Sequence, residues 1–406
     1  MKLTIPNNIF YQFLFILCVS VPYLDIFELT IGTWSLTFLI TIRNNYSISL
    51  FKLIIPYILI LLIAFVVSFN YDYQKYFIIR DVTYLLKPVI GFFLGYQLCH
   101  KNLNNAFKLI VTTGVFIAIC HIAVILSAIF IYGARTVADL RLHSGYFSDY
   151  EIYTLIILIF YKKFQLDYSK KTVRILTILV GFSAFMYLAR TNFIQFLILF
   201  LALKGYFELN KKSILIFASI IITSIISYSI VLYINPRRDA EGVEGFLYKI
   251  KVAPLEPFKT KINREDYKDF NDNYRSYENI MTIRQVTRDG VTPTIFGKGL
   301  GSQIDLKQEV RLGDMNLRFI SILHNGFMIV FLKSGLLGIF FYLFTIFYFF
   351  NSPKSETGIG NQITLLFIGT GVFLFISNWV FLGFYNLTET KSILLGFLIA
   401  YREKYK

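Results

Sequence analysis

Long apolar stretches, separated by short polar segments, dominate the pattern along this chain. Stretches such as Asn8–Leu24, Leu109–Ile131 and Ile214–Ile234 are long enough to cross a hydrocarbon core, which takes about 20 apolar residues. They do not alternate between polar and apolar positions, as the strands of a membrane barrel would. Because a helix satisfies its own backbone hydrogen bonds inside a bilayer, the pattern predicts an all-α polytopic membrane protein.

The apolar segments predict about twelve transmembrane helices with one large polar loop between the ninth and the tenth. The first nine fill residues 1–234, the loop covers 235–319, and the last three fill 320–406. We expect a short helix in the loop at about 273–289, because Gly290 and then Pro293 follow it as stop signals. The twelve helices are placed at residues 8–24, 29–42, 53–69, 82–99, 109–131, 148–161, 173–189, 191–209, 213–234, 320–350, 362–382 and 390–402.

Basic side chains decide the orientation, since cytoplasmic loops carry an excess of Lys and Arg. If the N-terminus lies inside, alternate loops and the tail contain Arg43, Lys52, Lys101, Lys108, Lys162, Lys163, Lys170, Lys171, Arg174, Lys204, Lys211, Lys212, Lys354, Arg402, Lys404 and Lys406. This predicts cytoplasmic termini and an external loop at 235–319. The same rule divides Val173–Leu203 into a helical hairpin whose outer turn contains Arg190.

The composition supports a membrane protein and argues against several classes of partner. The chain is 56% hydrophobic and 16% charged, whereas soluble domains average about 25% charged residues. Much of its net charge of +15 is the ordinary basic excess of cytoplasmic loops, so no nucleic acid is expected. The three cysteines lie in or beside apolar segments and suggest no disulfide framework. Since no P-loop, HExxH or CxxC pattern occurs, we expect no metal and no cofactor.

Several arginines fall on the expected outer side, and arginine suits phosphate because its planar fork donates two parallel hydrogen bonds. Arg190 stands out because its neighbours are apolar. On the loop helix, Arg284 and Arg288 share a face, whereas Arg275 points to the opposite side. Either Arg275 or the Arg284/Arg288 pair therefore contacts a diphosphate. The outer cations are Arg135, Arg141, Arg190, Arg275, Arg284, Arg288, Arg311 and Arg318.

Among the four histidines, His324 is the candidate general base, because it begins the tenth helix where the chain returns from the loop. His100 and His121 are interpreted as structural. Asp149 and Glu151 are reserve base candidates. Lys333, nine residues beyond His324, either pairs with an acid or extends to the interface, and the sequence does not decide between these.

A glycine cluster, Gly297-Lys298-Gly299-Leu300-Gly301, follows the expected loop helix. A dinucleotide site would need a strand before it and a βαβ unit, for which the loop has little room. The cluster therefore predicts a tight turn that brings the backbone close to another element.

Three separated motifs resemble the membrane family of O-antigen polymerases and O-antigen ligases. The first is Arg275 with the run Pro293 to Gly301, and the second is His324-Asn325 with Gly335-Leu336-Leu337-Gly338. The third is Leu188-Ala189-Arg190-Thr191, where Ala189 replaces the usual serine. A fourth, shorter match runs from Arg141 to Gly145-Tyr146-Phe147.

The resemblance implies an inverting, metal-independent glycosyl transfer in the bacterial inner membrane, with the active site on the periplasmic side. The donor would be a glycan on undecaprenyl diphosphate, held by Arg190, Arg275 and Arg141. His324 would deprotonate the acceptor hydroxyl, and Asn325, Gly297, Gly299 and Gly301 would support the site.

The acceptor separates two alternatives within this family. Another lipid-linked repeat unit would define a polymerase, which is the preferred interpretation, and the lipid A core would define a ligase. A chain-length regulator would be a typical protein partner, and membrane lipid surrounds the chain. From a different class, a lipid-linked oligosaccharide flippase is also possible.

Overall fold

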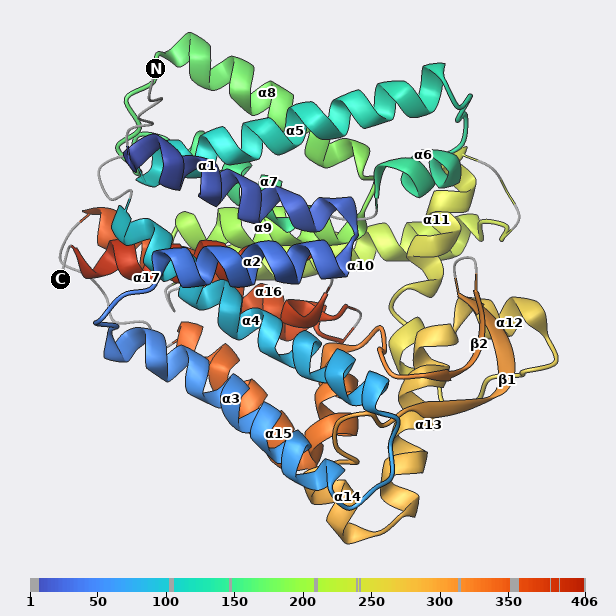
Figure 1. Cartoon of the computed structure of the whole chain (residues 1–406). Coiled ribbons are helices and arrows are strands. Elements are labelled where there is room, and N and C mark those ends of the chain that lie inside the picture. Colours follow the sequence, from blue (N-terminus) through green and yellow to red (C-terminus); the bar gives the residue numbers. More distant parts are fainter. Residues whose placement is uncertain are drawn as a thin grey trace.

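The computed structural model describes residues 7–101, 106–145, 148–207, 211–238, 240, 242–312, 315–350, 358–379, 381–386 and 388–404. Within these ranges it contains seventeen α-helices and one two-stranded sheet (Figure 1). A mostly helical fold is therefore confirmed, but the all-α prediction missed the sheet. Tyr146, Phe147, Lys354 and Lys406, which are named above, lie outside the described residues.

Each of the twelve predicted segments contains a helix. The first one continues into a 3₁₀ turn, η1 (Val21–Leu24). The twelve helices are α1 (Asn7–Ser20), α2 (Phe27–Thr41), α3 (Ile48–Ser68), α4 (Lys75–Lys101), α5 (Ala106–Phe130), α7 (Asp149–Ile159), α8 (Lys170–Met186), α9 (Arg190–Leu203), α10 (Lys211–Ile234), α15 (Gly326–Phe350), α16 (Gly358–Ser377) and α17 (Lys391–Glu403).

Five of the described helices, α3, α5, α10, α15 and α16, are long and apolar enough to cross a membrane by length and composition. The other predicted spans are shorter or, like α4, interrupted by charged side chains. At 1.5 Å per residue, α7 with its 11 residues is only about 16 Å long. Membrane-spanning character is thus supported, and the count of twelve spans stays a prediction.

The connecting segments carry the remaining elements. The loop helix expected at 273–289 is confirmed as α13 (Tyr274–Arg288). Strands β1 (Ile304–Leu312) and β2 (Met315–Ile320) pair antiparallel, with Ile304 opposite Ile320. The other short elements are α6 (Val137–Ser144), α11 (Gly242–Val252), η3 (Glu256–Phe258), α12 (Tyr267–Asp272), α14 (Val291–Phe296) and η4 (Gly383–Tyr385).

The predicted start of the tenth helix at residue 320 is wrong. Because Met315–Ile320 pairs with β1, helix α15 begins only at Gly326. His324 therefore lies in the bend before the helix and not in its first turn. This bend leaves nearly half of the His324 side chain exposed, at 46%.

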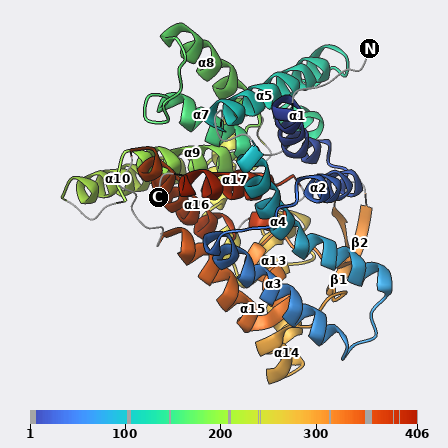
Figure 2. The same cartoon turned by 60° about the vertical axis from the view of Figure 1, so that its left-hand side comes forward.

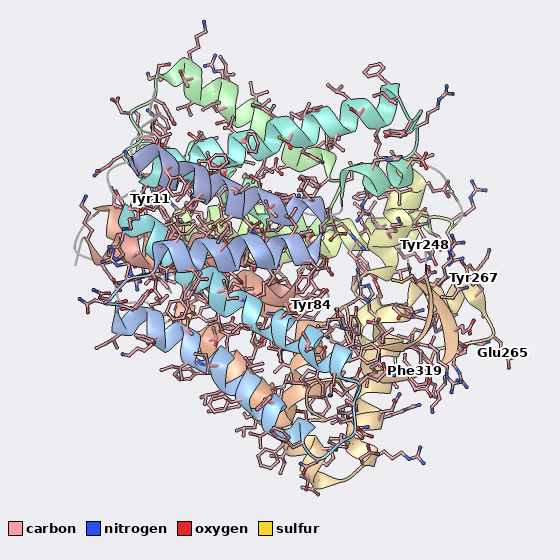
Figure 3. The ribbon with its side chains drawn as sticks, in the orientation of Figure 1. Tyr11, Tyr84, Tyr248, Glu265, Tyr267 and Phe319 are labelled. Carbon is pink, nitrogen blue, oxygen red and sulfur yellow. The ribbon has the colours of Figure 1, made fainter. Side chains whose placement is uncertain are left out.

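The elements of residues 242–320 gather at one end of the helical bundle (Figures 1 and 2). Figure 3 shows Tyr248, Glu265, Tyr267 and Phe319 at that end, and Tyr11 at the opposite end. The start of α1 and the end of α17 also lie at the opposite end (Figure 1). The described helical ends nearest the two termini are therefore on the same side of the bundle.

Helix α17 forms the centre of the bundle and packs closely on α4. Glycines allow this contact, since an added Cβ at Gly95 would lie 1.8 Å from the Ile393 carbonyl oxygen. At Gly396 an added Cβ would lie 2.1 Å from the Phe92 carbonyl oxygen. Small residues at a helix crossing let two backbones approach, which is typical of helices packed in membranes.

The predicted hairpin at Val173–Leu203 is confirmed, because α8 ends at Met186 and α9 begins at Arg190. Leu188 takes a left-handed conformation between them, with φ of 50°. Its backbone N–H donates to Phe185. Thus Arg190 begins α9 at the hairpin turn, as expected.

The glycine cluster makes the close backbone contact that its composition predicts. Helix α15 is broken at Gly335, where φ is 65°. The carbonyls of Leu332 and Lys333 next to this break accept hydrogen bonds from Lys298 N (2.8 Å) and Gly299 N (3.0 Å). An added Cβ at Gly297 would lie 2.5 Å from the Lys333 carbonyl carbon, so a side chain there has no space.

Lys333 pairs with an acid, which resolves the choice that the sequence left open. Its Nζ lies 2.5 Å from Asp81 Oδ2 and donates to the Ser302 carbonyl at 2.6 Å. Asp81 Oδ2 also accepts from Gly301 N at 2.7 Å. The ion pair therefore joins α4 and α15 to the glycine cluster in a site with almost no solvent access.

We expect Lys333→Met to destabilise the protein by about 3–5 kcal/mol, because the Asp81 charge would stay buried without its partner. The double variant Lys333→Met/Asp81→Leu should recover part of this loss. Thermal unfolding of the purified protein in detergent measures both. Equal destabilisation by the single and the double variant would show that the ion pair itself is not the cause.

Candidate functional site

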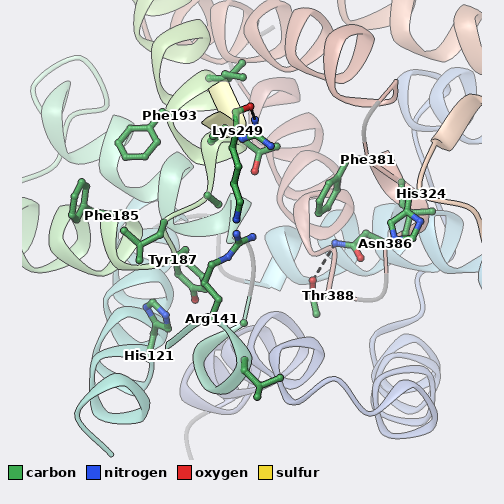
Figure 4. Close-up of a pocket in the computed structure, with 18 of the residues that line it drawn as sticks. His121, Arg141, Phe185, Tyr187, Phe193, Lys249, His324, Phe381, Asn386 and Thr388 are labelled. Carbon is green, nitrogen blue, oxygen red and sulfur yellow. Dashed lines mark hydrogen bonds between the residues drawn. The ribbon is translucent and has the colours of Figure 1, made fainter. Parts of the chain in front are cut away.

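A cavity of about 3130 Å³ is lined by residues of the loop elements together with residues of the helical bundle. Its walls come from α1, α5, α6, the α8–α9 turn, α11, α13, and the segment that joins α16 to α17. Figure 4 shows part of its lining. Segments from almost the whole length of the chain thus meet around one space.

One wall of the cavity is cationic. Arg190 Nη1 donates to the Lys249 carbonyl at 2.9 Å, which fixes its guanidinium between α9 and α11. Arg190 lies close enough to three charged side chains to interact with them electrostatically: it is attracted by Glu256 and repelled by Arg275 and Arg141. Partial burial, followed by the charges of Arg141 and Arg190, lowers the pKa of Lys249. Like charges held this close favour an anionic ligand between them.

The acidic side chains of the cavity do not balance these cations. Among the described lining residues, the acids are Asp25, Glu256 and Asp272. Asp272 already accepts from Arg238 Nε at 2.8 Å and from the Tyr248 hydroxyl at 2.7 Å. Glu256 lies 3.4 Å from Arg275 Nη1. The cationic lining residues are Arg135, Arg141, Arg190, Arg238, Lys249 and Arg275, so the described lining of the whole cavity has six cations and three acids.

His324 lines the same cavity and is held by Glu278. Its Nδ1 lies 3.0 Å from both carboxylate oxygens of Glu278, and its backbone N–H donates to Oε2 at 3.1 Å. Because a carboxylate only accepts, Nδ1 carries the hydrogen and Nε2 of the neutral ring carries a lone pair. The Glu278 side chain is 1% exposed. Thus His324 is oriented as a proton acceptor.

Tyr274 packs edge-on against His324, with 5.8 Å between ring centroids. Burial, followed by the Glu278 charge, raises the pKa of the Tyr274 hydroxyl. This phenol therefore stays neutral beside the imidazole and limits its movement.

Sequence reasoning missed two residues of the site, Glu278 and Lys249. For Glu278 a signal was present, because it lies three residues after Arg275 and so shares a helix face with it. For Lys249 no motif exists, since α11 reaches Arg190 only through the tertiary fold.

The structure brings Arg275, and not the Arg284/Arg288 pair, to the His324 cavity. Arg284 and Arg288 line a separate pocket of about 760 Å³, together with Lys261, Arg264 and Lys307. That pocket and the main cavity share none of their described lining residues. The helical geometry had excluded a single site for all three arginines, and the structure resolves which of them faces His324.

Arg318 also lies away from the main cavity. Its Nε donates to Asp305 Oδ1 at 2.9 Å, across the hairpin. The Arg318 guanidinium holds the pKa of the Asp305 carboxyl well below its usual range. This cation is therefore paired within the sheet.

The expected supporting residues organise the backbone beside His324 and at the break in α15. Asn325 Oδ1 accepts from Phe327 N at 2.9 Å and from Met328 N at 3.2 Å, so it caps α15 directly after His324. Gly297, Gly299 and Gly301 pack against α15, α3 and the segment before α4, outside the described lining of the cavity.

The reserve bases Asp149 and Glu151 are both buried and are absent from the described lining of the cavity. Asp149 Oδ2 lies 2.5 Å from Lys391 Nζ, and Glu151 Oε1 accepts from the Ser183 hydroxyl at 2.5 Å. Neither residue therefore replaces His324 as the base facing the cationic wall.

The remaining walls of the cavity are apolar and partly exposed. These side chains include Phe13, Phe116, Phe185, Phe193 and Ile194, from α1, α5, α8 and α9. A large cavity with one cationic wall and one apolar wall suits an amphipathic anion.

No family model matches this chain, and no curated protein matches it. In the part of the chain that the structure describes, no three His, Cys, Asp or Glu side chains gather as a metal site. The chemistry of the cavity is therefore inferred from its own side chains.

Proposed function

We propose that this protein is a membrane glycosyltransferase that polymerises oligosaccharide repeat units carried on undecaprenyl diphosphate. The observation that carries this proposal is the His324–Glu278 pair in a cavity that also contains Arg141, Arg190 and Arg275. The apolar wall suits the lipid, the cations suit the diphosphate, and the imidazole suits an acceptor hydroxyl.

In the proposed reaction, His324 Nε2 removes the proton of the acceptor hydroxyl. The acceptor oxygen then attacks the anomeric carbon of the donor sugar, and the bond from that carbon to the diphosphate oxygen breaks. Arg141, Arg190 and Arg275 neutralise the leaving diphosphate. A single displacement of this kind inverts the anomeric configuration. Glu278 stabilises the imidazolium that forms on His324.

For topology, we propose that the end of the bundle formed by residues 242–320 faces the periplasm of a bacterial inner membrane. The ends of α1 and α17 nearest the termini would then be cytoplasmic. The basic loops between the helices support this orientation, because such loops are usually cytoplasmic. The loop elements also lie at the end of the bundle opposite to the last turn of α17, as this orientation requires (Figure 1).

A ligase that uses the lipid A core would share the same donor site. The polymerase is preferred because the chain is rich in Phe, Tyr and Ile and its motifs depart from the family pattern, as expected of proteins that vary with the repeat unit they recognise. Its acceptor would be a second lipid-linked repeat unit, with a chain-length regulator as a possible partner. A flippase would need no oriented base, so the His324–Glu278 pair supports an enzyme over transport.

The test is the surface polysaccharide of cells that lack the protein, compared with cells that carry the wild type or His324→Ala. A polymerase predicts lipid A core capped by a single repeat unit in the deletion and in the variant. Long polymer on undecaprenyl diphosphate beside bare lipid A core would instead identify a ligase. Repeat units confined to the inner leaflet, with a normal pattern for His324→Ala, would contradict the enzyme proposal.

We expect Glu278→Gln to lower kcat roughly 10²-fold, because the amide can turn its NH₂ toward His324 Nδ1 and favour the wrong tautomer. The KM for the lipid-linked donor should change little, since Glu278 does not belong to the cationic wall. Steady-state kinetics of the purified variant would measure both constants. An equal change in KM and kcat would argue for general distortion of the site.

A further inference from the structure

The segment between α16 and α17 forms a further wall of the cavity. Its described residues contribute Trp379, Phe381, Leu382, Asn386 and Thr388 to the lining. Trp379 is one of the two tryptophans of the chain and is 38% exposed. A large aromatic ring that stays open to a cavity, with polar side chains nearby, indicates a ligand that covers the ring.

Trp379 contacts both halves of the candidate site. Its ring centroid lies 5.7 Å from that of Phe327, which follows His324 by three residues at the start of α15. It also lies 6.1 Å from the ring centroid of Phe258, in the 3₁₀ turn η3 that forms an ion pair with Arg275. A ligand on the indole is therefore placed between the base and the cationic wall.

Asn386 supplies polar groups to the same wall. Its Nδ2 donates to the Thr388 hydroxyl at 3.1 Å, and Figure 4 draws both side chains on the side of the pocket where His324 lies. This bond uses one amide N–H and leaves the other N–H and the Oδ1 atom without a partner among the described residues. A planar amide with a free donor and a free acceptor can bind two neighbouring hydroxyls of one ligand.

The backbone of this segment is anchored to two helices. Gly326 N, two residues after the base, donates to the carbonyls of Asn378 and Phe381 at 2.9 Å and 3.0 Å. The buried Lys87 of α4 donates from Nζ to the Asn386 carbonyl at 2.6 Å. The indole and the amide therefore keep fixed positions relative to the base, as a specific binding site requires.

An open indole next to a partly unpaired amide matches the chemistry of a sugar ring. One face of a pyranose presents C–H groups that can cover an aromatic ring, and its hydroxyls lie around the edge, where they need donors and acceptors. A lipid chain would leave the amide without hydrogen bonds, which is costly once water is excluded. A phosphate would favour the arginines of the cationic wall over a neutral amide.

We propose that Trp379 and Asn386 bind the acceptor sugar, with the indole against the ring and the amide on hydroxyls beside the one that His324 deprotonates. The acceptor is favoured over the donor because the base contacts the acceptor, and this segment is joined to the chain that carries the base. Thr388 and Lys87 are positioning residues, since they act through Asn386. This inference rests on the proposed function and deepens it by separating an acceptor subsite from the diphosphate site.

The test uses the repeat-unit saccharide, released by mild acid from the lipid-linked intermediate of the host and labelled at its reducing end. This saccharide has no diphosphate, so it can only accept, and the lipid-linked unit at fixed concentration is the donor. Asn386→Ala in the purified protein should raise the KM for the saccharide about tenfold, the order expected for two lost hydrogen bonds. The kcat should change little, because the base is intact.

Trp379→Leu should raise the same KM severalfold, because a branched side chain does not present a flat face to the sugar. Trp379→Tyr keeps a flat ring and should stay close to the wild type. The Kd of undecaprenyl diphosphate, which carries no sugar, should be unchanged in all three variants.

Asn271→Ala is the matched control, because Asn271 is an exposed amide of the same cavity lining, on α12. It should leave the KM for the saccharide unchanged. If the wild type polymerises the lipid-linked unit but Asn386→Ala and Trp379→Leu do not raise this KM, the inference is wrong while the proposed function stands. Equal weakening of saccharide and undecaprenyl diphosphate, or a polymerising wild type that does not use the saccharide, would also overturn it. A wild type that forms no glycosidic bond would overturn both.

Discussion

His324→Ala is expected to reduce the rate of sugar transfer by about 10²–10⁴-fold, the usual contribution of a positioned general base. The structural reason is the orientation of its imidazole, since two Glu278 oxygens at 3.0 Å hold Nδ1 and leave Nε2 as the acceptor. Donor affinity should change little, because His324 is proposed to contact the acceptor hydroxyl and not the diphosphate of the donor. Single-turnover transfer with purified protein measures the rate apart from binding.

The matched control is His143→Ala, which removes another exposed imidazole from the lining of the same cavity. This variant should transfer at the wild-type rate. Wild-type transfer by His324→Ala would instead show that His324 is not the base.

The double variant Arg190→Gln/Arg275→Gln is expected to weaken donor binding by about 10²–10⁴-fold. Each guanidinium can make charge-assisted hydrogen bonds to the diphosphate, and each such bond contributes about 1.5–3 kcal/mol. Arg190 and Arg275 lie close enough for their charges to interact, so one diphosphate can contact both. The measurement is the Kd of an undecaprenyl-diphosphate-linked glycan for the purified protein.

Arg284→Gln/Arg288→Gln is the matched control, since it removes two cations from α13, the helix that carries Arg275, and lowers the net charge equally. These side chains line the separate pocket, so donor binding should change less than about threefold. Equal effects of the two double variants would mean that overall charge, and not the geometry of the His324 cavity, governs binding.

The helical positions were largely predictable because the apolar segments are long and sharply bounded. The prediction of α13 at 273–289 succeeded because Gly290 and Pro293 mark its end. Splitting Val173–Leu203 into α8 and α9 needed the positive-inside rule, since hydropathy alone is continuous there. These features can be predicted because they depend on local sequence signals and on the distribution of basic loops, and neither requires the tertiary fold.

The β-hairpin was missed although Ile304, Leu306 and Val310 are apolar among polar neighbours. Its pairing depends on residues on both sides of the turn, and the surrounding helices gave no reason to expect a sheet. The late start of α15 follows from the same error, since Ile320, the last residue of β2, was assigned to the helix.

The site was predictable only in part. Spacing on one helix showed that Arg275 and the Arg284/Arg288 pair face opposite ways, but not which of them faces His324. That depends on how α13 packs against the bundle. The partners of the buried charges, such as Asp81 for Lys333, likewise lie hundreds of residues away and follow from tertiary packing alone.

The most direct test of the central claim is reconstitution of the purified protein into liposomes with an undecaprenyl-diphosphate-linked repeat unit as the sole substrate. The account predicts a ladder of longer lipid-linked glycans with inverted anomeric linkages, formed without added metal and absent for His324→Ala. Movement of the unchanged repeat unit across the bilayer, with no new glycosidic bond and equal rates for both proteins, would contradict it.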